Sequence, residues 1–230
     1  MLHRSLAAAL AAALSGCLVA PDPALQMGPG AKVSSDGLHL VDHVPFGTLY
    51  MRPDYTFGSY RHFTMGKTHV SFRPDSRVLS DVEVAEMVRR FDAVARQVIL
   101  DSGRIEVQAP GPCIARVSLG LVDIDLLDPK ELTAHGTSTV LDSYGSLTLV
   151  LEIRDSYTTE PLLRYGRRRR LEGGQVTGVD PAEVAALSTT LVDFARGIEH
   201  DFQRALPRIA SESPRSCEER AGLTPPVAAP

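Results

Sequence analysis

Two segments of the chain carry hydrophobic residues at helical spacing. The first follows Ser80-Asp81-Val82-Glu83, a capping-box sequence that typically begins a helix. Its apolar positions are Val84, Met87, Val88, Phe91, Val94, Ala95 and Val98. The second follows Asp180-Pro181-Ala182-Glu183, an N-cap with a proline at the first helical position, and its apolar stripe runs from Val184 to Leu206. The spacing predicts two amphipathic helices, each with one face in the core.

Other segments alternate between hydrophobic and polar residues, as strands do. Residues 60–72 are rich in strand formers, but their apolar positions change parity around Gly66, which predicts a bend. Residues 105–108 predict a short strand. Residues 115–121 alternate cleanly and residues 122–126 continue on the opposite parity, which predicts a β-bulge between them.

The clearest alternation predicts a hairpin. Residues 147–153 alternate, a polar turn covers 155–161, and a return strand covers 162–171. With this turn, the numbers of opposed residues sum to 316, so that Glu152 faces Arg164. The order of elements predicts an α+β fold: a mainly antiparallel sheet with two amphipathic helices packed on one face.

The N-terminus has the proportions of a bacterial lipoprotein signal. His3 and Arg4 precede an apolar run that is too short to span a bilayer, and Leu14-Ser15-Gly16-Cys17 matches a lipobox. We therefore expect a signal peptide over 1–16 and lipidation of Cys17. Leu18 then favours the outer membrane, because an aspartate at that position is associated with inner-membrane retention. The alternative is an ordinary secretory signal with an incidental cysteine.

Composition and charge divide the remainder of the chain. Residues 17–44 have the Pro, Gly and Ser content of a flexible tether, residues 45–206 form a single periplasmic domain, and residues 207–230 are typical of a disordered tail. The chain has 230 residues and a formal net charge of −4, which argues against a nucleic-acid partner.

Cys113 and Cys217 are the two cysteines of the expected mature protein. An oxidising compartment permits a disulfide between them, and the alternative is two unpaired thiols.

Candidate catalytic and metal sites are weakly supported by the sequence. Gly66-Lys67-Thr68 matches only the end of a phosphate-binding loop, and the expected glycine five residues before Gly66 is absent. Three further groups have the residue types of a metal or triad site, but each lies in a predicted loop, linker or strand edge. They are His39 with Asp42 and His43, Asp123 with Asp125 and Asp128, and His135 with Ser138 and Asp142. We expect no catalytic residue, no metal and no cofactor.

Arginines are concentrated in the return strand of the hairpin. Arg164, Arg167, Arg168, Arg169 and Arg170 lie within seven positions. The register places Arg164, Arg168 and Arg170 on one face, where they form a candidate patch for anionic lipid headgroups or an acidic partner. The alternative is a solvated edge strand whose charge prevents pairing with other chains, in an arginine-biased protein.

Three features together resemble a Gram-negative lipoprotein family, domain of unknown function 3313. They are the lipobox, the stretch from Gly145 to Arg170 with its Leu-Glu-Ile-Arg-Asp-Ser core, and the closing amphipathic helix. The family commonly has a Thr-Gly turn where this chain has Thr158-Thr159-Glu160-Pro161. The resemblance implies an uncharacterised envelope lipoprotein and no catalytic residue.

These observations predict a non-enzymatic lipoprotein on the periplasmic face of the outer membrane. It would contact an envelope protein as an accessory to assembly or transport. The alternative function is a binding module for envelope lipid or glycan, although a chain without tryptophan is a weaker candidate for stacking on sugars.

Overall fold

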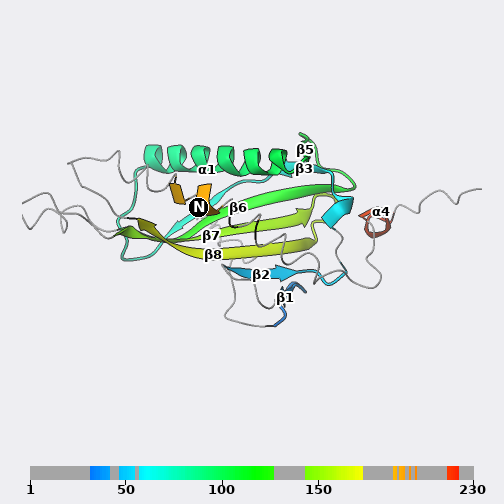
Figure 1. Cartoon of the computed structure of the whole chain (residues 1–230), viewed down its shortest axis with the longest axis horizontal. Helices are drawn as coiled ribbons and strands as arrows, with labels where there is room; N and C mark the ends of the chain where they lie inside the picture. Colours follow the sequence, from blue (N-terminus) through cyan, green and yellow to red (C-terminus); the bar gives the residue numbers. More distant parts are fainter. Residues whose placement is uncertain are drawn as a thin grey trace, which may run out of the picture.

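The computed structural model describes residues 32–41, 47–54, 57–126, 143–172, 189–190, 192–194, 197, 200 and 217–222. Its strands form one eight-stranded sheet (Figure 1). They are β1 (His39–Val41), β2 (Thr48–Met51), β3 (His62–Met65), β4 (His69–Phe72), β5 (Ile105–Glu106), β6 (Ile114–Leu126), β7 (Ser143–Asp155) and β8 (Pro161–Glu172). The order across the sheet is β1-β2-β8-β7-β6-β3-β5, with β4 also paired to β6.

The sheet is mixed, which corrects the expectation of a mainly antiparallel one. Strands β1, β2, β8, β7 and β6 pair antiparallel in that order. Strands β3 and β4 both run parallel to β6, and β5 runs parallel to β3. A helix lies between β4 and β5 in the chain, and such a crossover lets the strands before and after it run in the same direction.

Helix α1 (Asp81–Asp101) begins where the sequence predicts. The Ser80 hydroxyl accepts from the Glu83 N–H, and the Glu83 carboxylate accepts from the Ser80 N–H, so the capping box is formed. The helix lies along one face of the sheet (Figure 1) and buries Met87 and Phe91. One of the two expected helices is thus confirmed in full.

The second expected helix is described only in part. Residues 189–190, 192–194, 197 and 200 are helical. The Phe194 ring lies 6.4 Å from the Phe91 ring and 5.8 Å from the Tyr165 ring, centroid to centroid. Phe194 therefore packs with α1 and β8 in the core.

Irregularities in the strands occur where the hydrophobic parity changes. The chain breaks between β3 and β4 at residues 66–68, and the β6–β7 register shifts between Val122 and Asp125. Asp123 adopts φ 51° at that shift. Both the bend at Gly66 and the bulge in β6 are confirmed.

The β7–β8 hairpin has the predicted register. Leu151 faces Tyr165, Glu152 faces Arg164 and Thr148 faces Arg168. The alternation places leucines of β7 in the core, while Glu152 and Arg164 point to the opposite face of the sheet.

The ordered structure extends beyond residues 45–206 at both ends. β1 lies within the expected tether and pairs with β2, and Leu38 beside it is fully buried. Helix α4 (Cys217–Arg220) lies within the expected tail, and Cys217 is buried. Long-range contacts hold both segments on the domain, and amino-acid composition does not reveal such contacts. In the part of the chain that the structure describes, no helix has the length and apolarity needed to cross a membrane.

Candidate functional site

Strand β8 divides the arginine cluster into two parts. Arg164 faces Glu152 in the half of β8 that also pairs with β2, and this pairing reaches Gly166, which lies opposite Thr48 at the start of β2. Arg168 and Arg170 lie beyond that pairing, opposite Thr148 and Ser146 of β7. All three share one face, as predicted, but their surroundings differ.

Arg164 is buried and ion-paired, with only 4% of its surface exposed. Its Nε and Nη2 donate to Glu152 Oε2 at 2.9 and 2.8 Å, and Nη2 also donates to Asp36 Oδ2 at 2.5 Å. Glu152 is 1% exposed and also accepts a hydrogen bond from Arg154. Removing one member of such a cluster costs about 3–5 kcal/mol, because a buried charge then loses its partner.

The cluster shifts the pKa of two of its members. Burial opposes ionisation of Asp36, yet hydrogen bonds from Arg164 and Ser34 hold the pKa of Asp36 below its ordinary value. Burial likewise works against the charged form of Arg164, but its hydrogen bonds to Asp36 and Glu152 raise the pKa of Arg164. The pairing therefore outweighs the desolvation of both groups.

Arg164 is consequently no part of a solvent-facing patch, which corrects the sequence-based prediction. The sequence identified Glu152 as its partner but gave no signal for Asp36, which lies 128 residues away in a turn assigned to the tether. Arg168 and Arg170 are exposed. Arg168 Nη2 donates to Ser146 Oγ at 3.2 Å, and neither arginine forms an ion pair among the described residues.

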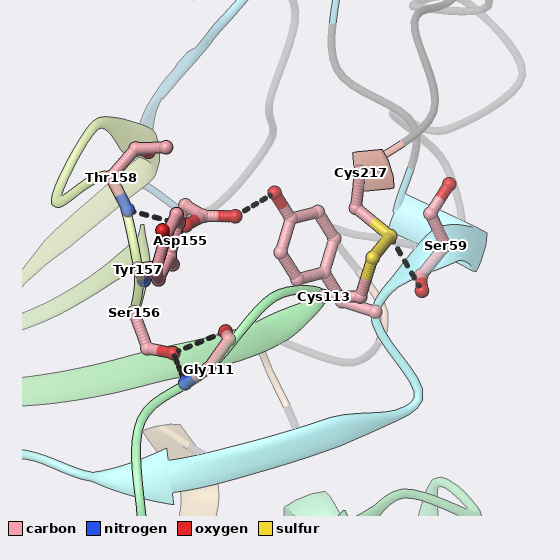
Figure 2. The surroundings of a disulfide bond; sticks show 9 residues. Ser59, Gly111, Cys113, Asp155, Ser156, Tyr157, Thr158 and Cys217 are labelled. Atoms are coloured by element: carbon pink, nitrogen blue, oxygen red, sulfur yellow. Dashed lines mark hydrogen bonds between the residues drawn. A yellow bond between two sulfur atoms is a disulfide. The ribbon is translucent and has the colours of Figure 1, made fainter. Parts of the chain in front are cut away.

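The two cysteines are joined at the other end of the hairpin. Cys113 follows β5 in a left-handed turn with φ 58°, and Cys217 begins α4. Their Cα atoms lie 5.1 Å apart, within the range of a disulfide, and the structure contains that bond (Figure 2). Cys217 Sγ lies 3.4 Å from the Ser59 carbonyl oxygen. The bond ties the C-terminal segment to the start of β6.

The hairpin turn is fastened beside this disulfide. Asp155 is 1% exposed; its Oδ2 accepts from the Tyr60 hydroxyl at 2.6 Å, and its Oδ1 accepts from the N–H groups of Tyr157 and Thr158 (Figure 2). The Ser156 hydroxyl donates to the Gly111 carbonyl oxygen and accepts from the Gly111 N–H, both at 3.0 Å. These contacts hold the turn against the loop that carries the disulfide.

The weaker candidates from the sequence do not form a site among the described residues. His39 lies in β1, while Asp42, His43 and the group His135, Ser138 and Asp142 lie outside the described residues. Asp125 forms an ion pair with Arg73 at 3.2 Å, and Asp123 is exposed at the bulge. Asp128 is also outside the described residues. Cys17, the expected lipidation site, lies outside the described residues as well.

The Thr68 hydroxyl of the partial phosphate-loop match donates to Asp92 Oδ1 at 2.5 Å. This hydrogen bond joins the segment between β3 and β4 to α1.

Comparisons with known proteins do not assign a family. No protein-family model matches the chain, and no curated protein matches it. The resemblance to domain of unknown function 3313 therefore stays a prediction.

Several solved structures show weak likeness to the chain. A PelC dodecamer from Paraburkholderia phytofirmans is 7% identical with a TM-score of 0.37, and the alignment covers 66% of this chain and 98% of that one. A protein from Xanthomonas campestris of domain-of-unknown-function family 330 is 12% identical with a TM-score of 0.35, covering 64% and 86%. A minor lipoprotein from Acinetobacter baumannii is 9% identical with a TM-score of 0.30, covering 65% and 95%. Likeness at this level assigns neither a family nor an activity.

Proposed function

We propose that the protein is a non-enzymatic lipoprotein of the bacterial cell envelope. Cys17 anchors it to the periplasmic face of the outer membrane, and its domain acts through contacts with an envelope assembly or transport machine. The observation that carries the proposal is the N-terminal sequence, in which Leu14-Ser15-Gly16-Cys17 follows a short apolar run at the spacing of a lipoprotein signal.

The cysteine pair supports export of the chain. Disulfides persist in the periplasm and are rare in the cytosol, where thiols are kept reduced. The bond between Cys113 and Cys217 joins segments 104 residues apart, so it constrains a large part of the domain. A chain that forms such a bond fits an oxidising compartment.

The anchor and the fold together suggest a scaffold that presents a surface. Acyl chains contribute about 0.8 kcal/mol per buried CH₂ group, so a multiply acylated cysteine holds a domain on a membrane stably. Met87 and Phe91 of α1 are buried in the core, and the opposite face of the sheet carries the Arg164–Glu152 ion pair. The absence of catalytic motifs from the sequence is the basis for a non-enzymatic role.

Fractionation of the native host tests the proposal. We expect the wild-type chain in the outer-membrane fraction and a Cys17→Ser variant in the soluble periplasm. Reversible cross-linking of the wild type in intact cells should then co-purify an envelope protein that the variant recovers poorly. Recovery of the wild type as a soluble protein, or an unchanged distribution of the variant, would contradict the anchor.

A further inference from the structure

We propose that Arg168 and Arg170 form a docking surface for the phosphate groups of anionic membrane lipids. The proposal rests on the proposed lipid anchor for its cellular setting. It concerns the exposed half of β8, the arginine face, which we define as Arg168 and Arg170 with the flanking Ser146 and Thr148.

The arginine face differs electrostatically from the adjoining part of the same strand. Arg164 is neutralised inside the protein by Glu152 and Asp36. Four and six residues further along, Arg168 and Arg170 are exposed and form no ion pair among the described residues. Alternate residues of a strand lie about 6.6 Å apart on one face, so the two guanidinium groups can reach one phosphate or two adjacent ones. The planar fork of arginine suits phosphate oxygens.

The surroundings of these arginines favour a charged surface over a folded protein partner. Protein interfaces are organised around buried aromatic or aliphatic anchors within a polar rim. The side chains opposite Arg168 and Arg170 are hydroxyls, and the exposed large hydrophobic residues of the described structure all lie outside the arginine face. They are Val33, Val78, Val82, Leu100, Ile105 and Tyr157. Contact through charge and hydroxyl groups alone fits the headgroup layer of a membrane.

The path of the chain directs this face toward the anchor. Asp36 binds Arg164, so the segment entering the domain lies on the same face of the sheet as Arg168 and Arg170. β1 is two strands from β8, a distance of about 10 Å. Fourteen residues separate Cys17 from Lys32, and they span at most about 50 Å. A lipidated Cys17 would thus keep the arginine face within reach of the bilayer.

Two arginines are enough to orient a tethered domain. An arginine near an anionic membrane surface strengthens binding roughly fivefold, the equivalent of about 1 kcal/mol. Two arginines then strengthen binding to the membrane about 30-fold, which is a small gain for a protein without an anchor. For an anchored protein the contact is intramolecular, and a factor of this size determines which face the domain turns to the membrane.

Vesicle binding tests the proposal on the chain from residue 17 onward, carrying Cys17→Ser and an intact disulfide. The probes are vesicles of phosphatidylcholine alone and vesicles with about one-third phosphatidylglycerol. We expect binding to the anionic vesicles only, with loss of binding as NaCl rises to about 0.5 M. Arg168→Gln/Arg170→Gln should bind about 30-fold more weakly.

Arg89→Gln/Arg90→Gln is the matched control. It removes the same charge from exposed positions on α1, which covers the other face of the sheet. We expect this variant to bind like the wild type. Circular dichroism should show that all three chains are folded.

Four results would overturn the proposal. The first is equal binding of the wild type to both kinds of vesicle, and the second is equal loss in the control variant. The third is displacement of the protein from anionic vesicles by inorganic phosphate to a greater extent than by NaCl at equal ionic strength, which would indicate a site for free anions. Binding to polyglutamate without binding to anionic vesicles would also overturn it, in favour of an acidic protein partner. Because these measurements use an unlipidated chain, their failure is distinguishable from failure of the Cys17 anchor.

Discussion

Removal of the disulfide should destabilise the domain strongly. We consider the double variant Cys113→Ala/Cys217→Ala, which removes the bond without leaving a lone thiol. The cross-link closes a loop with a sequence separation of 104 residues. The chain-entropy model gives about 4.7 kcal/mol for a loop of this length, as an upper value for the loss in free energy of unfolding. For a domain of this size, that corresponds to a fall in melting temperature of about 10–20 °C.

Thermal unfolding of the oxidised wild type, the reduced wild type and the double variant measures this loss. The reduced wild type and the variant should melt close together and well below the oxidised wild type. A reductant should leave the variant unchanged, which controls for effects unrelated to the bond. Oxidised and reduced wild-type chains that melt within about 2 °C of each other would refute the reasoning, because a bond that constrains the unfolded chain this much must move the transition.

Three further substitutions test particular contacts. Thr159 adopts φ 62°, so Thr159→Gly should raise the urea midpoint by the equivalent of about 1 kcal/mol; an unchanged midpoint would show that the turn is unstrained. Asp155→Ala should cost about 3 kcal/mol in urea unfolding, because the buried Tyr60 hydroxyl and two turn N–H groups lose their acceptor; a cost below about 1 kcal/mol would count against these bonds. Pairing lowers the pKa of Asp36 in the folded state below its ordinary value of 3.8. The ionised carboxylate therefore stabilises the fold at pH values above 3.8, and this stabilisation is lost as the pH falls through 3.8 and then through the lower pKa of the folded state. The stability gap between wild type and Asp36→Asn should therefore be largest near neutral pH and close in acid; a gap independent of pH would argue against the pairing with Arg164.

Local signals in the sequence predicted local structure well. The Ser80–Glu83 capping box located the start of α1, because its two hydrogen bonds join residues only three apart. The β7–β8 register followed from the turn length and from alternation, since a slip of one residue would move the leucines of β7 to the other face. The change of parity after Leu121 likewise revealed the bulge at Asp123.

Features that depend on distant contacts could not be predicted in this way. Alternation shows that a segment is a strand but does not give the direction of its partner, so the parallel pairing of β3 and β4 with β6 was missed. The Pro, Gly and Ser content around β1 indicated a tether, yet the buried Leu38 side chain and the Asp36–Arg164 pair hold part of this segment on the sheet. Nothing near Arg164 in the sequence reports a carboxylate 128 residues away.

The candidate site was likewise predictable where it depends on local contacts and unpredictable where it depends on distant ones. Glu152 was predictable as the partner of Arg164, because the two face each other across the hairpin. The burial of Arg164 was not, because it depends on Asp36 and on Tyr50 of β2, which also lies opposite Arg164. The structure therefore separates a buried, paired arginine from two exposed ones that the sequence placed in one patch.

The intact mass of the mature protein, extracted from membranes of the native host, tests the central claim most directly. The account predicts a chain that begins at Cys17 and carries the added mass of a diacylglyceryl group and an amide-linked acyl chain. It also predicts a peptide map in which Cys113 and Cys217 are linked before reduction and separate after it. A soluble periplasmic chain with an unmodified Cys17 would contradict the account.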